Sequence, residues 1–189
     1  MKVSGVNRDI LRAAFVFILA VFIIAGCSDD DSGSSPVVEL SNSVWVDQIT
    51  GFSGQTAVRV GVYFANTTPI ASLEVPLRAT GFGFSIDSVS FYGSRLDPSI
   101  LTESVVSDYS GEVLLSALAV QDGVAYIDSG QGLLGNIYFT LFSESRGEVI
   151  EIDTFSVDDA TRHSLLYIDT TGIGEIVPEY FPGEISVLQ

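Results

Sequence analysis

Residues 56–65 read TAVRVGVYFA, and this stretch decides the class of fold. Its apolar side chains occupy every second position, at Val58, Val60, Val62 and Phe64. Arg59 and Tyr63 take positions between them. Because successive side chains of a β-strand point to opposite faces, this period of two predicts a strand with one face in the core and the other toward water.

The same period recurs along the chain between clusters of Gly, Asn, Asp and Ser. Further strands are predicted at residues 44–48, 70–79, 85–91, 112–120, 134–142, 148–155, 165–169 and 183–188. No stretch keeps the 3.6-residue period of a long helix. About nine short strands without crossover helices predict an all-β protein, built as an antiparallel sandwich or barrel. The predicted core adds Leu73, Val75, Ile137, Phe139 and Ile185.

Two places in this pattern allow more than one interpretation. Pro76 lies inside a predicted strand but has no N–H to donate, so that strand is expected at a sheet edge or with a bulge. The segment 97–109 has no clear period. It is expected to hold either a short strand around 101–106 or a helical turn that begins at Asp97-Pro98-Ser99.

The N-terminus has the features of a secretory signal. Before residue 13 the chain carries the basic side chains Lys2, Arg8 and Arg12, and the uncharged run AAFVFILAVFIIA follows at 13–25. This run is shorter than the roughly 20 residues of a spanning helix and suits a signal peptide. It ends in Ile24-Ala25-Gly26-Cys27, which resembles the lipobox of bacterial lipoproteins. The resemblance implies a signal peptide at residues 1–26, cleavage before Cys27 and acylation of its thiol.

Cys27 opens a short tether at residues 27–36, which continues as SDDDSGSSP and is predicted to be flexible. The globular domain is expected at residues 37–189. From Cys27 onward the chain keeps 5 of its 8 basic and 23 of its 24 acidic residues, a formal charge of −18. Such a surface repels nucleic acid and anionic headgroups, so membrane attachment is expected only through the lipid on Cys27. Ser28 resembles the sorting signal of lipoproteins that reach the outer membrane of diderm bacteria, which implies a location in the cell envelope.

Several segments together resemble the bacterial cohesin domain. They are Val44-Trp45-Val46, TAVRVGVYFAN at 56–66, PIASLEVPLRA at 69–79, GFSIDSVSF at 83–91, GLLGNIYFTLF at 132–142 and PGEISVL at 182–188. The resemblance extends over nearly all of residues 43–188. It implies a nine-stranded jelly-roll sandwich, related to some carbohydrate-binding modules, that binds dockerin domains through one sheet face and catalyses nothing.

The residues themselves also offer little for catalysis, and we expect no enzyme. His163 is the single histidine, which excludes a multi-histidine metal centre. Ser53 lies in GFSGQ, which lacks the final glycine of a nucleophile elbow. Asp128-Ser129-Gly130 and Asp31-Ser32-Gly33 match the aspartic-protease tripeptide, but both are predicted as turns.

No cofactor is expected either. The acidic excess leaves one alternative, which is weak binding of Ca²⁺ by loop 108–112 or by Asp153 together with Asp158 and Asp159. Neither shows the alternating ligands of a known calcium loop. A solvated acidic surface is therefore the preferred interpretation.

The predicted binding residues are three aromatic side chains, Tyr63, Tyr138 and Trp45. Tyr63 and Tyr138 alternate with predicted core positions and are expected to point outward. Trp45 lies between Val44 and Val46, and either phase could be the buried one. Outward rings can anchor a protein partner or stack on sugars, whereas their structural alternative is to cover a neighbouring strand.

Two functions follow from these residues and from the resemblance. The first is binding of a protein partner, of dockerin type or another envelope protein, through one sheet face. The alternative is binding of polysaccharide through exposed aromatics. A flat face of mixed polar and aliphatic residues would favour a protein, and two or more coplanar rings would favour a sugar.

The lipid anchor is testable with Cys27→Ser, because a serine hydroxyl cannot receive the thioether lipid. We expect the variant to remain unprocessed at residue 27, which mass spectrometry of the N-terminus would show. A variant that is cleaved before residue 27 and still sediments with membranes would contradict the lipoprotein interpretation.

Overall fold

The computed structural model describes residues 41–119, 126–156, 165–172 and 174–189. Every described residue belongs to the compact unit Glu39–Gln189. No helix in the described ranges is long and apolar enough to cross a membrane. The described strands are β1 (Ser43–Val46), β2 (Gln48–Phe52), β3 (Val58–Asn66), β4 (Ile70–Thr80), β5 (Phe84–Ser90), β6 (Leu101–Ser107), β7 (Glu112–Leu118), β8 (Gly130–Leu141), β9 (Val149–Thr154), β10 (Leu166–Asp169), β11 (Glu175–Ile176), β12 (Glu179–Phe181) and β13 (Gly183–Leu188). A 3₁₀ turn, η1 (Ser143–Ser145), connects β8 to β9.

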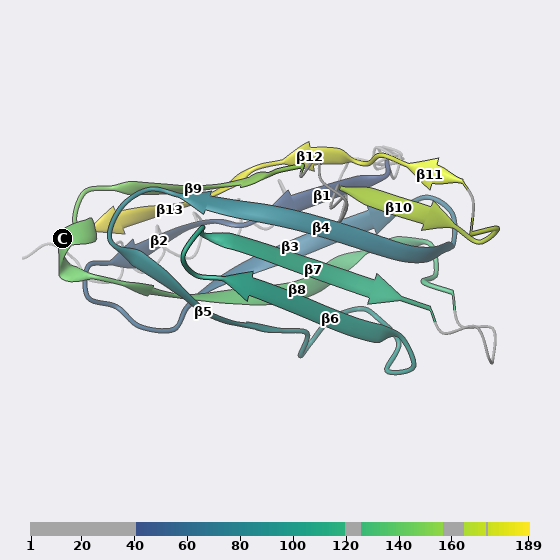
Figure 1. Ribbon diagram of the computed structural model, residues 1–189, viewed down its shortest axis with the longest axis horizontal. Helices are drawn as coiled ribbons and strands as arrows, with labels where there is room; N and C mark the ends of the chain where they lie inside the picture. The colour runs from purple at the N-terminus through teal and green to yellow at the C-terminus, as the bar shows by residue number, and fades with distance from the viewer. Residues whose placement is uncertain (1–40, 120–125, 157–164, 173) are drawn as a thin grey trace, which may run out of the picture. The chain divides into compact units, whose positions relative to one another are not determined.

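These strands form two sheets packed face to face, which confirms the predicted jelly-roll sandwich (Figure 1). The first sheet has the order β12-β1-β3-β8-β5. The second has the order β11-β10-β4-β9-β13-β2, and β7 also pairs with β4 and carries β6 at its outer side. Most pairs are antiparallel, but β1 with β12 and β2 with β13 are parallel, so both sheets are mixed.

Both parallel pairs arise because the chain crosses from the first sheet to the second at two places that lie side by side. The chain leaves the first sheet between β1 and β2 and enters the second, and it does the same between β12 and β13. The two crossings lie against each other at Asp47 and Gly183. A β-carbon on Gly183 would lie 2.7 Å from the carbonyl oxygen of Asp47 and would also collide with the side chain of Val46, so only glycine fits there.

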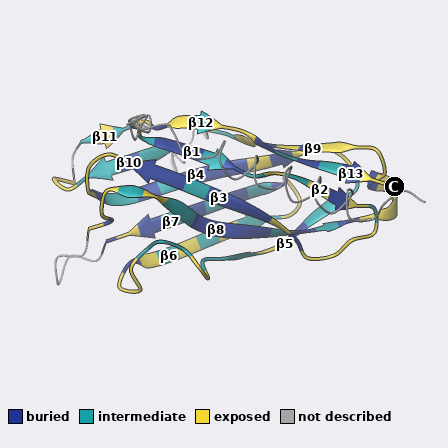
Figure 2. Ribbon diagram, turned by 180° about the vertical axis from the view of Figure 1, so that it is seen from behind, coloured by how far each residue is buried: buried dark blue, intermediate teal, exposed yellow. Residues whose placement is uncertain are grey.

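The core lies between the sheets, and it contains all nine residues assigned to it from alternation. They are Val58, Val60, Val62, Phe64, Leu73, Val75, Ile137, Phe139 and Ile185. Figure 2 shows the buried residues running along β3, β4, β7 and β8, whereas β6 and β9 show exposed positions. Each fully buried Val, Leu, Ile or Phe contributes roughly 1.5–3 kcal/mol relative to exposure, so this apolar layer is the main source of stability.

Polar groups close one end of the core. The buried hydroxyl of Tyr167 lies 2.8 Å from the Ser43 carbonyl and 3.1 Å from the Ala65 carbonyl, and thus links β10 of the second sheet to β1 and β3 of the first. Burial raises the pKa of Tyr167, so the phenol keeps its proton. The buried Asn66 amide donates to the carbonyls of Thr68 and Asp128, and the Arg95 guanidinium lies 3.9 Å above the Phe64 ring.

The structure corrects two expectations about strands. Residues 48–52, of which only Gln48 was included in a predicted strand, form β2 and pair with β13 over their whole length. Of the two expectations for the strand with Pro76, the edge position is wrong, since β4 is central in its sheet. The other, a bulge, agrees with a register shift of β4 against β10 between Ile168 and Asp169. Pro76 is tolerated because it lies where the partner of β4 on that side changes from β10 to β9, so no strand needs its N–H there.

The segment 97–109 contains both of the predicted alternatives in succession. A turn at Asp97–Ile100, with a 2.9 Å hydrogen bond from the Ile100 N–H to the Asp97 carbonyl, precedes β6. β6 pairs only with β7, so it is an edge strand.

The core assignment is testable at two adjacent residues of β3. Val60 is fully buried and Arg59 is exposed. Val60→Asp buries an unpaired charge and should lower the free energy of unfolding by about 3–5 kcal/mol, whereas Arg59→Asp should change it by less than about 1 kcal/mol. Urea unfolding followed by circular dichroism measures both, and equal losses would contradict the assignment.

Candidate functional site

Trp45 and Tyr63 meet on the outer face of the first sheet. They are directly opposite each other on β1 and β3, with ring centroids 5.5 Å apart and planes within 6° of parallel. Val44 and Val46 are buried, so the outward phase of β1 is the one that carries Trp45. Phe181 of β12 is the next residue in the same row. We call the outward Phe181, Trp45, Tyr63 and Tyr138 the aromatic face.

Local contacts explain how the Tyr63 ring is held. Its hydroxyl donates to the Asp47 carboxylate at 3.4 Å, and the Gly61 N–H donates to the same oxygen at 3.0 Å. A β-carbon on Gly61 would lie 2.7 Å from the Tyr63 ring, so the glycine makes room for it. Burial and then the neighbouring Asp47 carboxylate raise the pKa of Tyr63, which keeps the phenol a neutral donor.

Tyr138 does not join this pair. It also lies on the outer face, but opposite Arg59 of β3 and Ser88 of β5. Arg59 and Tyr63 are four residues apart on β3, about 13 Å along the strand. The three predicted binding residues therefore share one sheet face without forming one site.

The outer face of the second sheet carries an aliphatic surface that the sequence did not reveal. Leu101, Val105 and Leu118 are 55, 54 and 49% exposed on β6 and β7. The pairing places Leu101 beside Leu118, and Val105 beside Leu114 and then Pro76 of β4. Pro76 is itself buried, so we call the outward residues Leu101, Val105, Leu114 and Leu118 of β6 and β7 the aliphatic face.

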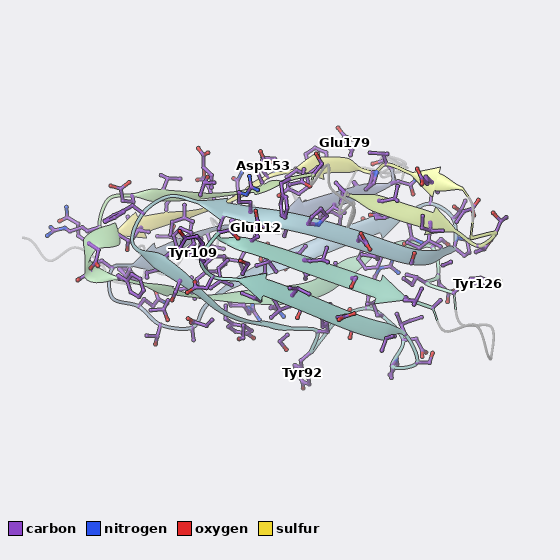
Figure 3. All side chains as sticks on the ribbon, viewed as in Figure 1. Tyr92, Tyr109, Glu112, Tyr126, Asp153 and Glu179 are labelled. Atoms are coloured by element: carbon purple, nitrogen blue, oxygen red, sulfur yellow. The ribbon has the colours of Figure 1, made fainter. Side chains whose placement is uncertain are left out.

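Charges lie among and beside these aliphatic side chains. Glu103 and Glu74 flank Ser116 in one row, between the two aliphatic rows. In a further row Arg78 forms a 2.6 Å ion pair with Glu112, and the same guanidinium lies 4.7 Å from the Phe155 ring. The hydrogen bonds from Arg78 and then Ser110 lower the pKa of Glu112. Figure 3 shows Glu112 and Asp153 on this side of the molecule, where each pairs in register with Arg78.

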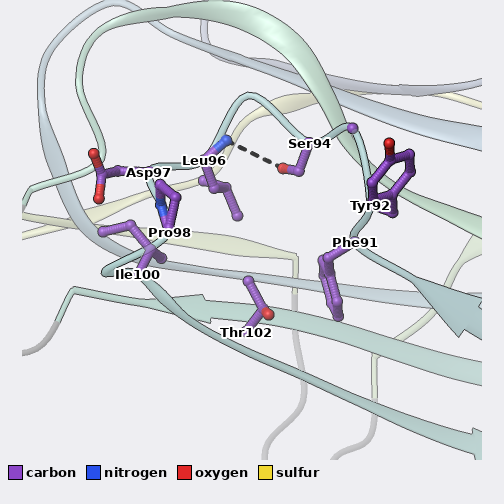
Figure 4. A pocket seen from close by; sticks show the side chains of 9 residues that line it. Phe91, Tyr92, Ser94, Leu96, Asp97, Pro98, Ile100 and Thr102 are labelled. Atoms are coloured by element: carbon purple, nitrogen blue, oxygen red, sulfur yellow. Dashed lines mark hydrogen bonds between the residues drawn. The ribbon is translucent and has the colours of Figure 1, made fainter.

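A pocket of about 300 Å³ lies beside the start of β6 (Figure 4). Its wall consists of residues 91–94 and 96–98 with Ile100 and Thr102, and Phe91, Leu96 and Ile100 supply apolar side chains. The Asp97 carboxylate already accepts from the N–H and hydroxyl of Ser99, at 2.8 and 2.6 Å, and these bonds lower its pKa. This pocket can accept an apolar group, but the one carboxylate in its wall is already hydrogen-bonded, and the wall contains no histidine, lysine or cysteine that could act beside it as base or nucleophile.

Several predicted residues lie outside the described ranges, namely Cys27, Ser28, His163, Asp158 and Asp159. Among the residues that the structure describes, no three His, Cys, Asp or Glu side chains lie close enough to hold a metal ion. In loop 108–112, the Asp108 carboxylate accepts from the Ile86 N–H at 3.0 Å and thus braces the β6–β7 turn against β5.

The aliphatic face was missed for a physical reason. β7 reads Val113-Leu114-Leu115, with apolar residues on both phases, so alternation does not say which side is buried. Its outward leucine only becomes recognisable when β6 lies beside it with Leu101 and Val105 on the same side. The apolar residues on both sides of β7 were the one sign in the sequence that this strand has an exposed apolar side.

The comparisons with known proteins find structural neighbours only. The chain matches no protein-family model and shows no significant match to a curated protein. Among solved structures it is similar to the sixth cohesin of scaffoldin B from Acetivibrio cellulolyticus, solved with a Cel5 dockerin, at a TM-score of 0.63 and 16% identity over 78% of this chain and 99% of that one. It is also similar to a non-cellulosomal cohesin of the archaeon Archaeoglobus fulgidus, at a TM-score of 0.59 and 13% identity over 79% and 92%.

A third neighbour agrees with these two. The OlpC cohesin of Clostridium thermocellum, solved with the dockerin Doc435, has a TM-score of 0.63 and 14% identity over 79% of this chain and 94% of that one. The described domain therefore has the cohesin fold.

The Trp45–Tyr63 pair gives a test of the aromatic face. A double-mutant cycle of Trp45→Ala and Tyr63→Ala, measured by urea unfolding with circular dichroism, should show a coupling of about 0.5–1.5 kcal/mol. The matched cycle of Trp45→Ala with Tyr138→Ala should show none, because those rings occupy different rows. Equal coupling in both cycles would contradict the described pairing.

Proposed function

We propose that this chain is a lipid-anchored, non-catalytic binding module of the cell envelope, and that its aliphatic face receives a protein partner of dockerin type. The observation that carries the proposal is the row-by-row placement of exposed Leu101, Val105 and Leu118 on adjacent strands. Exposed apolar patches of this kind mark interaction surfaces. The solved neighbours with this fold that are recorded in complexes have dockerins as partners, which supports the partner class.

The composition of this face suits a protein. Aliphatic side chains alternate with Ser72, Ser116 and Glu103, the mixture of apolar centre and polar neighbours that protein interfaces show. Arg78 is the single basic residue of β4, β6 and β7, against Glu74, Glu103 and Glu112. A complementary partner surface should therefore combine apolar and basic side chains, and its association should weaken with rising salt.

The polysaccharide alternative has less support. Trp45 and Tyr63 are parallel, as a sugar platform requires, but each ring stacks against the other and Tyr63 is tied to Asp47. Tyr138 stands in a different row. The contacts of Trp45 and Tyr63 are those of a cross-strand pair that stabilises the sheet.

The lipid anchor belongs to the same proposal. It is supported by the basic start, the apolar run at 13–25 and the lipobox-like sequence that ends at Cys27. A module held in this way would present its sheet faces to proteins near the membrane, with the outer membrane as the proposed location in a diderm bacterium because Ser28 follows Cys27.

Isothermal titration of the chain from Cys27 onward against a panel of calcium-loaded dockerin domains tests the partner class. We expect at least one to bind, and Val105→Glu to weaken that binding at least tenfold, because it places a charge in the apolar centre of the interface. Val177→Glu makes the same change at an exposed position between β11 and β12 and should leave the affinity unchanged.

Two results would contradict the proposal. Absence of binding to every dockerin would overturn the partner class. Binding that survives Val105→Glu but is lost in Trp45→Ala would place the partner on the aromatic face. A glycan array on the same protein would reveal a sugar ligand.

A further inference from the structure

One end of the sandwich carries exposed phenylalanines on three separate loops. Phe52, Phe82 and Phe142 are 55, 61 and 39% exposed. They lie where β2 and β13 end and where the chain turns from β4 to β5 and from β8 to β9, all at the end near the C-terminus (Figure 1). We call loops 51–57, 81–84 and 142–148 together the tip.

Backbone hydrogen bonds join these loops to one another. The Leu141 N–H donates to the Gln55 carbonyl at 2.8 Å, and the Phe142 N–H donates to the Gly83 carbonyl at 2.8 Å. The Ser53 N–H donates to the carbonyl of Leu188 at 3.1 Å. The three exposed phenylalanines therefore lie on segments that backbone hydrogen bonds hold in place.

Two of the three loops of the tip carry no charge. The whole chain carries 24 acidic residues, yet 51–57 (GFSGQTA) and 81–84 (GFGF) contain no ionisable side chain. Loop 142–148 contains Glu144 and Glu148 with Arg146 between them. Phe52 and Phe82 therefore lie on uncharged loops, and the loop of Phe142 has a formal charge of −1.

The reach of the chain allows the tip to meet the membrane that would hold Cys27. Residues 27–42 can extend to at most about 53–58 Å at 3.3–3.6 Å per residue. The ten residues from Ser43 to Phe52 span only about 33 Å as strand. The anchor can therefore lie at the level of the tip.

We propose that the tip is a membrane-contact site, where Phe52, Phe82 and Phe142 enter the interfacial region of an uncharged, zwitterionic lipid surface. This rests on the lipid anchor of the proposed function and adds a second contact to it. Aromatic and aliphatic side chains on such a surface are buried about 5–10 Å into the boundary of headgroups and acyl chains. Because the tip lies at strand ends, contact there leaves the aliphatic face free at the side of the molecule for its protein partner.

The test uses the single cysteine of the chain to bypass cellular acylation. The chain from Cys27 onward, which contains the whole compact unit 39–189, is coupled through that thiol to a maleimide lipid in phosphatidylcholine vesicles. Trp45 is the only tryptophan, so Phe82→Trp in a Trp45→Phe background places the sole indole at the tip. Leu101→Trp in the same background is the matched control on the aliphatic face.

Vesicles with acyl chains brominated near the headgroup should quench most of the emission of the Phe82→Trp variant and leave that of the Leu101→Trp variant almost unchanged. Adding Phe52→Ser and Phe142→Ser to the Phe82→Trp variant should restore much of its emission. Quenching that is equal for the two indoles, or absent at the tip, would overturn the proposal. Because coupling is chemical, this outcome is independent of whether Cys27 is acylated in the cell and of whether a dockerin binds.

Discussion

The structure depends on two neighbouring crossings between the sheets, where the chain passes from β1 to β2 and from β12 to β13. Asp47 lies at the first crossing and takes part in four hydrogen bonds. Its N–H donates to the Gly61 carbonyl, its carbonyl accepts from the Glu184 N–H, and its carboxylate accepts from the Gly61 N–H and the Tyr63 hydroxyl. Because Gly183 has no side chain, the crossing from β12 to β13 can pass close to the Asp47 carbonyl. The crossing strands thus connect both sheets at their margin, and Tyr167 connects them again at one end of the core.

This arrangement gives the two outer faces different physical characters. On the first sheet, the large side chains beside the crossing are engaged with one another, as in the Trp45–Tyr63 pair. On the second sheet, the β6–β7 hairpin extends away from the crossing, and Leu101 and Val105 have no further strand beside them. Apolar area that stays in water on a well-packed sandwich is the feature that distinguishes a binding surface from a structural one.

Low identity with the cohesin neighbours is compatible with this fold. At 12–19% identity the TM-scores still reach 0.57–0.63 for this chain against cohesins of bacterial and archaeal origin. A core of this kind needs apolar residues of suitable size at alternating positions, which many sequences satisfy. The surfaces are under no such requirement, so charge and exposed aliphatic residues can differ widely on one architecture.

The sequence by itself determined the fold class and which face of most strands is buried, because alternation in segments such as Val58–Asn66 reports the side of a strand directly. It could not decide the phase of Trp45, the central position of Pro76 or the aliphatic face of β7. Each of these depends on which strand lies alongside, and strands that pair are often far apart in the chain, as β2 and β13 are. Only the tertiary structure decided them, because a period of two distinguishes two faces but carries no information about neighbours.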